Sequence, residues 1–155
     1  MRGYWDTRTD RNRNECLASM LDKQEPESIL EVGCNCGNKL YGIALTYPHA
    51  RLSGIDINPR AVELGCRWLE EAGIINVELS TGRAEDLSRF DDRCFDVVFS
   101  WAALIYPRPS QIRNILSNMT RIANKAIILL EVQSSVPMSR ARAAGTYFYG
   151  HWKRD

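Results

Sequence analysis

Short apolar runs alternate along this chain with longer amphipathic stretches, which is the pattern of strands alternating with helices. Strands are expected at residues 28–32, 51–55, 76–80, 95–100 and 126–132. Helices are expected at residues 12–21, 38–47, from 59 onwards and at 110–122. Because successive strand–helix–strand units place parallel strands side by side, this alternation predicts a doubly wound, mainly parallel α/β sheet.

Three of these segments also indicate which of their faces are buried. Strand 95–100 contains three consecutive large apolar residues, Val97, Val98 and Phe99, so both of its faces should be covered. The helix from residue 59 is expected to bury Ala61, Gly65, Trp68 and Ala72, supported by Val62 and Leu69. The helix at 110–122 is expected to bury Ile112, Ile115, Leu116, Met119 and Ile122.

Length and charge narrow the class of protein. We expect one domain over residues 1–155, with its core at 27–132. The formal net charge of +1 comes from 20 basic and 19 acidic residues, so no broad field favours nucleic acid or an anionic membrane. Arg140 and Arg142 could contact a phosphate, but two arginines are more often simply solvated. The longest apolar runs are far shorter than the roughly 20 residues of a membrane span, and residues 1–8 lack a signal peptide's apolar segment, so a cytoplasmic protein is expected.

The five cysteines form no regular framework, so we expect reduced thiols and no disulfide. Cys34 and Cys36 make a C-x-C pair without a second cluster or a nearby histidine, so no metal site is expected.

The candidate ligand site begins where the first strand ends. Gly33 and Gly37 bracket a tight turn in which a side chain would block a ligand's approach to the backbone, and Asn35 between them tolerates a left-handed conformation. Asp56 follows the second strand, 19 residues after Gly37, where a carboxylate can accept hydrogen bonds from both hydroxyls of a ribose. An adenosine-type ligand is implied, whereas the alternative for Asp56 is a helix-capping or loop carboxylate beside Asn58.

Residues 31–37, 54–59 and 95–100 together resemble the class I S-adenosylmethionine-dependent methyltransferases, and within them the small-molecule methyltransferases. The resemblance covers residues 27–132 and implies a Rossmann-like methyltransferase sheet. It also implies S-adenosylmethionine as the cofactor, S-adenosylhomocysteine as its product, and in-line displacement at the methyl carbon. Carried over residue by residue, it places Glu31 and Gly33 by the methionine part, Asp56 on the ribose and Ile57 on adenine.

Residues 81–87 resemble the family's adenine-edge motif, in which the Ala84 N–H meets a ring nitrogen. Many relatives have Asp or Ser where Arg83 stands, and arginine cannot accept a hydrogen bond from the adenine amine. Glu85 can replace that acceptor, or the contact is absent, and Arg83 is equally well explained as a solvated charge.

After the fourth strand, Ser100 and Trp101 should line the cleft near the sulfonium and the acceptor, although Trp101 is equally explained as a core residue. Tyr106 stands where many relatives carry histidine. No side chain is assigned as catalytic, because His49 and His151 are both unconvincing bases.

Three function classes follow: an active small-molecule methyltransferase, a non-catalytic or truncated cofactor-binding domain, and a nicotinamide-dependent oxidoreductase. The third fails because its G-x-G-x-x-G fingerprint needs glycine at Asn35 and Gly or Ala at Asn38. The family's sheet ends in an antiparallel hairpin, and residues 146–152 suit one further strand but hardly two. We therefore expect an incomplete hairpin, and the sequence does not specify the acceptor or the oligomeric state.

Overall fold

The computed structural model describes residues 11–131, 147–148 and 151–152. The helices there are α2 (Arg11–Asp22), α3 (Asn38–Thr46), α4 (Pro59–Glu71) and α5 (Pro109–Ile122). The strands are β1 (Ser28–Val32), β2 (Arg51–Asp56), β3 (Val77–Thr81), β4 (Phe95–Trp101), β5 (Ala123–Leu130), β6 (Tyr147–Phe148) and β7 (His151–Trp152).

Five strands form one sheet in the order β3-β2-β1-β4-β5. Every neighbouring pair in it is parallel, which confirms the predicted fold class. The central strand β1 pairs with β2 on one side and β4 on the other, so that Glu31 lies opposite both Gly54 and Phe99. Because the strands are parallel, their carboxyl ends all lie at one edge of the sheet.

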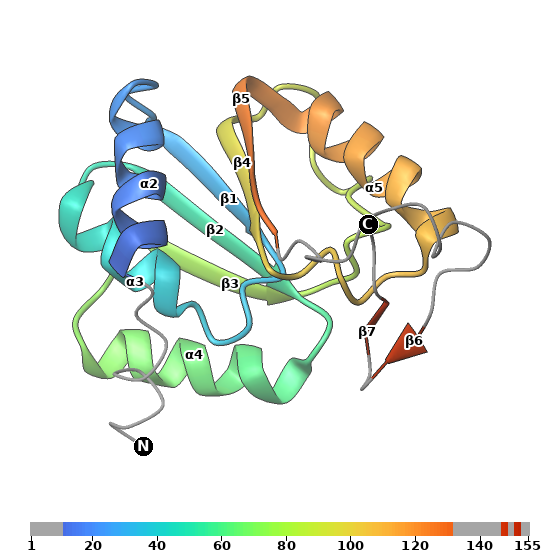
Figure 1. Cartoon of the computed structure of the whole chain (residues 1–155). Helices are drawn as coiled ribbons and strands as arrows, with labels where there is room; N and C mark the ends of the chain where they lie inside the picture. Colours follow the sequence, from blue (N-terminus) through green and yellow to red (C-terminus); the bar gives the residue numbers. More distant parts are fainter. Residues whose placement is uncertain (1–10, 132–146, 149–150, 153–155) are drawn as a thin grey trace.

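The sheet is covered on both faces (Figure 1). Alternate residues of a strand point to opposite faces, and accordingly Ile29 belongs to one buried cluster and Leu30 to the other. The first cluster includes buried residues of α2, α3 and α4, and the second includes those of α5. Val97, Val98 and Phe99 are each fully buried, as expected for a strand covered on both faces.

The position of β5 corrects the expectation of a strand at residues 126–132. Helix α5 ends at Ile122, and Ala123 already has the extended backbone of the strand, with φ −84° and ψ 135°. Asn124 and Lys125 are exposed, so the first residues of β5 lack the hydrophobic pattern by which strands are found in a sequence.

The predicted buried face is confirmed for α5 but only in part for α4. In α5, Ile115, Met119 and Ile122 are buried, and Ile112 and Leu116 pack beside them, as predicted. In α4 the buried residues are Val62, Gly65 and Leu69, whereas Ala72 is exposed and both Ala61 and Trp68 are half-buried. The expected face was therefore wrong at Ala72. A Cβ atom on Gly65 would lie 2.6 Å from the Cys36 carbonyl oxygen, so close packing at this glycine fixes the helix rotation.

The single C-terminal strand expected at 146–152 is replaced by two short ones. Strands β6 and β7 pair antiparallel with each other as a separate two-stranded sheet. Arg140 and Arg142 lie outside the described residues. All five cysteines are free thiols. None of the helices in the described ranges has the length and hydrophobicity that a membrane span requires.

Candidate functional site

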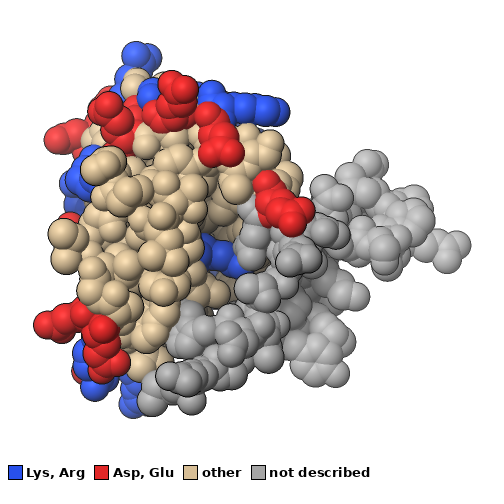
Figure 2. Space-filling model, turned by 90° about the vertical axis from the view of Figure 1, so that its left-hand side faces the viewer, with Lys and Arg blue, Asp and Glu red and all other residues tan. Residues whose placement is uncertain are grey.

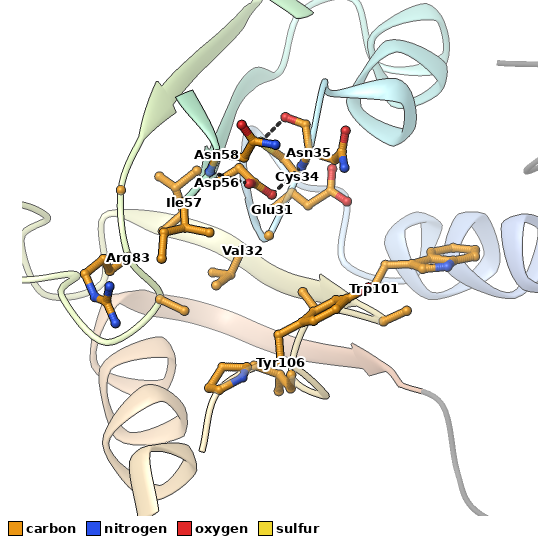
Figure 3. Close-up of a pocket in the computed structure, with 18 of the residues that line it drawn as sticks. Glu31, Val32, Cys34, Asn35, Asp56, Ile57, Asn58, Arg83, Trp101 and Tyr106 are labelled. Atoms are coloured by element: carbon orange, nitrogen blue, oxygen red, sulfur yellow. Dashed lines mark hydrogen bonds between the residues drawn. The ribbon is translucent and has the colours of Figure 1, made fainter. Parts of the chain in front are cut away.

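A cavity of about 1550 Å³ opens at the carboxyl edge of the sheet. Eight of the ten residues predicted to bind the cofactor line it: Glu31, Gly33, Asn35, Asp56, Ile57, Ala84, Glu85 and Trp101. The other two, Gly37 and Ser100, lie outside the lining. In the close-up, Arg83 and Trp101 lie at opposite ends of the labelled residues, with Asp56 and Glu31 between them (Figure 3). The cavity therefore has an Arg83 end and a Trp101 end.

The turn after β1 has the backbone that its sequence predicts. Gly33, Asn35 and Gly37 all have left-handed backbones, with φ of 84°, 51° and 75°. The expected approach of a ligand to this turn stays a prediction, and contacts with other protein atoms give a second reason for the glycines. A Cβ on Gly33 would lie 2.2 Å from that of Ala103, and one on Gly37 would lie 2.9 Å from Leu79. Packing within the protein alone therefore requires both glycines.

The Asp56 carboxylate is fixed by two backbone groups. Its Oδ2 accepts from the Asn35 N–H at 2.7 Å, and its Oδ1 accepts from the Asn58 N–H at 2.8 Å. Asp56 does not cap α4, since the Asn58 side chain accepts from the N–H groups of Arg60 and Ala61. Asp56 is thus not a helix cap but has the other alternative role, that of a loop carboxylate, which joins the glycine turn to the end of β2; its contact with a ribose stays a prediction.

Glu31 is the buried carboxyl group of the site. Its side chain is 2% exposed, and its Oε2 atom has no hydrogen-bond partner. The pKa of this carboxyl is raised from 4.5 to about 8, mainly by burial; the Lys39 charge opposes the rise and the Asp56 charge adds to it. A carboxyl of this kind favours a cationic partner, which would restore its charged form.

Sequence reasoning missed Lys39. Its Nζ lies 4.0 Å from the centre of a Trp101 ring, and both residues line the cavity. Trp101 also packs against the first buried cluster, which is the core role considered for it, whereas its contact with the cofactor stays a prediction. The sequence did contain a signal for it. A lysine in the first turn of a helix is unfavourable with respect to the helix dipole, so its presence there indicates another role.

At the Arg83 end of the cavity, Glu85 is held by two neighbours. Arg83 forms an ion pair of 3.2 Å with Glu85 Oε1, and the Gln111 amide donates to the same oxygen. Arg83 is 58% exposed, so it is both largely solvated and part of the cavity wall. The other carboxylate oxygen of Glu85, Oε2, is not used by these two contacts.

Ser100 lies beneath the cavity. It is fully buried, and its hydroxyl donates to Glu131 Oε1 at 2.7 Å. The second oxygen of Glu131 accepts from the Leu104 N–H at 3.1 Å, so this carboxylate holds the segment that follows β4. Sequence reasoning missed Glu131, although a single charge directly after the apolar run 126–130 was a usable signal.

Among the described residues, the cavity lining contains acids, amides, bases and aromatic groups but no histidine. Tyr106, which is 58% exposed, lines the cavity, whereas His49 is exposed and is not part of the lining. The described residues contain no group of three or more metal-binding side chains. Such a wall is suited to holding and orienting a ligand that brings its own reactive group.

Known proteins resemble this chain at the level of both sequence and fold. A bovine catechol O-methyltransferase is 28% identical over 102 residues, which are 61% of this chain and 38% of that protein. The structure of PKMT2 from Rickettsia typhi in complex with AdoHcy is 28% identical, with a TM-score of 0.58 over 65% of this chain and 19% of that one. The PH0226 protein from Pyrococcus horikoshii is similar in fold, with 22% identity and a TM-score of 0.67 over 81% of this chain and 59% of that one.

The chain spans only 4% to 38% of the length of the curated relatives that it matches. The family model described as a methyltransferase domain matches residues 29–126, which is more than half of the chain. This range includes all but the first residue of β1, the whole of β2 to β4, the glycine turn and Asp56. The chain therefore belongs to the methyltransferase-domain family, whose class I members use S-adenosylmethionine.

Proposed function

We propose that this domain binds S-adenosylmethionine in the cavity and transfers its methyl group to a small-molecule acceptor. The arrangement of Asp56 carries the proposal. Each oxygen of a carboxylate can accept two hydrogen bonds. The N–H groups of Asn35 and Asn58 occupy one position on each oxygen, fix the carboxylate in space and leave one position on each free. Two vicinal hydroxyls of a ribose need that pair of acceptors.

The residues on either side of Asp56 suit the other parts of the cofactor. Ile57 is 60% exposed in the cavity wall, and an apolar side chain there is stabilised when an adenine ring covers it. Glu85 Oε2 can accept from the adenine amine in place of the side chain that Arg83 cannot provide. The unpartnered Oε2 of Glu31 suits the ammonium group of the methionine part.

When bound, the cofactor supplies a methyl group on a positively charged sulfur, ready for in-line displacement. The protein supplies position and a partly dry cavity. The segment after β4 forms one wall and is tied to the end of β5, through the Glu131 carboxylate and through the Ala102 N–H, which donates to the Leu130 carbonyl at 3.0 Å. These ties fix where an acceptor would lie.

Two observations support a small acceptor. The cavity volume of about 1550 Å³ exceeds the roughly 300–1,000 Å³ of a typical single-ligand pocket, so a second small molecule fits beside the cofactor. The face in Figure 2 carries acidic and basic residues together near its margins, and its middle is mostly uncharged apart from a small group of basic atoms in the central hollow, so this face has no continuous basic patch on the described residues. A surface of this kind gives no electrostatic support to a nucleic-acid substrate.

The proposal is tested by following S-adenosylhomocysteine formation by mass spectrometry. The protein is incubated with S-adenosylmethionine and single acceptors bearing a hydroxyl, amine, thiol or carboxyl group, with catechol as the hydroxyl probe suggested by the bovine relative. We expect product with at least one acceptor, and a large loss of product in Asp56→Ala. Cofactor binding without transfer to any acceptor would instead support the non-catalytic domain.

A further inference from the structure

We propose that Glu31 carries a proton in the ligand-free protein near neutral pH and releases it to the solvent when a ligand with a cationic amino group binds. The inference rests on the proposed function, in which Glu31 meets the ammonium group of the methionine part of the cofactor. It adds a proton to that binding step. The affinity for the cofactor is then linked to pH through a single side chain.

The surroundings of Glu31 disfavour a negative charge on its carboxyl group. The side chain is 2% exposed, and its Oε2 atom has no hydrogen-bond partner. The residues opposite it in the neighbouring strands are Gly54 and Phe99, and neither carries a charge. Burying a carboxylate costs much more free energy than burying the neutral acid. Accordingly, the pKa of this group is raised to about 8.

Two charged groups act on Glu31 from other elements. Asp56, at the end of β2, adds to the rise in its pKa, and Lys39, in the first turn of α3, opposes the rise without cancelling it. Burial raises the pKa of the nearby Cys34 thiol, so this group stays neutral. The net effect of burial and both charges leaves Glu31 mainly protonated near neutral pH.

A bound amino group would reverse this balance. Glu31 lines the cavity, on the side of Asp56 away from Arg83 (Figure 3). With the ribose on Asp56 and adenine at the Arg83 end, the amino-acid part extends toward Glu31. An α-amino group has a pKa of about 8, so it is mostly cationic between pH 6 and pH 7. A positive charge in contact with a carboxyl group lowers its pKa, so Glu31 loses its proton and an ion pair remains.

The test is calorimetric titration of S-adenosylhomocysteine into the wild type and Glu31→Gln at pH 6 and pH 7. Each titration is run in two buffers that differ in their enthalpy of ionisation. We expect the wild-type Kd to be about three- to tenfold lower at pH 7 than at pH 6, with release of about half a proton or more. In Glu31→Gln the two Kd values should agree within about twofold, and the enthalpy should not depend on the buffer.

Methylthioadenosine provides a matched control ligand for the wild type. It shares adenine, ribose and sulfur with S-adenosylhomocysteine but lacks the amino-acid part. Its Kd should therefore change less than about twofold between pH 6 and pH 7, without proton release. This comparison of ligands decides the question even where Glu31→Gln binds S-adenosylhomocysteine too weakly to be measured.

A wild-type Kd for S-adenosylhomocysteine that is equal at the two pH values would overturn the proposal. The same proton release in Glu31→Gln, or with methylthioadenosine, would overturn it too, because the proton would then come from another group. Failure of the proposed function looks different, since the wild type would bind neither ligand at either pH. Circular dichroism of the variant verifies that its fold is retained.

Discussion

In the turn after β1, the same few residues are needed both for packing within the protein and for the proposed ligand site. Gly33 faces Ala103, Asn35 donates its N–H to Asp56, and Gly37 is the N-cap residue of α3. The sequence predicted this turn and its left-handed backbone from residue type alone. It could not predict Ala103 as the neighbour of Gly33, because that contact joins β1 to the segment after β4, about 70 residues along the chain.

Gly33→Ala is expected to destabilise the protein by at least about 2 kcal/mol, because it combines a positive φ with a Cβ clash at 2.2 Å. Gly42→Ala is the matched control, since it lies within α3 with no atom within 4 Å of an added Cβ. The control should be neutral or stabilising by up to about 1 kcal/mol. Urea unfolding measures both, and equal stability of the Gly33 variant and wild type would disprove the packing argument.

Glu31 predicts a specific pH dependence. Its pKa is raised from 4.5 to about 8 in the folded protein, so the unfolded chain releases this proton at a lower pH than the folded one. The raised pKa therefore favours folding fully below about pH 4.5, and this contribution is lost as the pH rises towards 8. The slope is at most about 1.4 kcal/mol per pH unit.

Glu31→Gln removes the titration and retains the shape of the side chain. Unfolding midpoints measured from pH 5 to pH 9 should show the wild type losing stability relative to this variant as the pH rises, with a plateau above pH 8. Parallel curves for the two proteins would mean that Glu31 titrates normally in the folded state.

At the level of elements, the sequence predicted strands and helices well where apolar patterns are regular and poorly where packing decides. The bounds of β1 and the buried stripe of α5 agree with expectation. The buried face of α4 agrees at Val62, Gly65 and Leu69 but not at Ala72, which follows the last residue of the helix and is exposed. The roles of Lys39 and Glu131 depend on partners distant in sequence.

Helix α5 also carries a polar stripe that no hydrophobic pattern reveals. Gln111, Asn114, Asn118 and Arg121 recur at helical spacing, and all bond to residues 85–92. The stripe thus fastens the Arg83 end of the cavity to α5.

Arg121→Ala tests this stripe, because the Arg121 guanidinium donates to the carbonyls of Leu87 and Phe90 and to Asp92. We expect a loss of about 1–3 kcal/mol and faster hydrogen exchange across residues 85–92. Arg113→Ala, at an exposed position of the same helix, should stay within about 0.5 kcal/mol of the wild type. Unchanged exchange in the Arg121 variant would show that the stripe does not hold the segment.

At the scale of the whole molecule, cofactor binding should add to stability, since the cavity is formed by segments from several strands and helices. S-adenosylhomocysteine at about 100 times its Kd would stabilise the folded state by about 2.7 kcal/mol. In a chain of 155 residues this corresponds to a rise in Tm of roughly 5–10 °C, measurable by differential scanning fluorimetry. No rise in Tm at saturating ligand would contradict this linkage.

The central claim is that Asp56 holds the ribose of the cofactor, and calorimetric titration with S-adenosylhomocysteine tests it most directly. The wild type and Asp86→Ala, a control at an exposed carboxylate outside the cavity lining, should bind with a Kd of about 1 μM, or roughly 8 kcal/mol. Asp56→Ala should weaken binding by about 1.5–3 kcal/mol. A folded wild type that does not bind the ligand, or an Asp56 variant that binds it as tightly, would contradict the account.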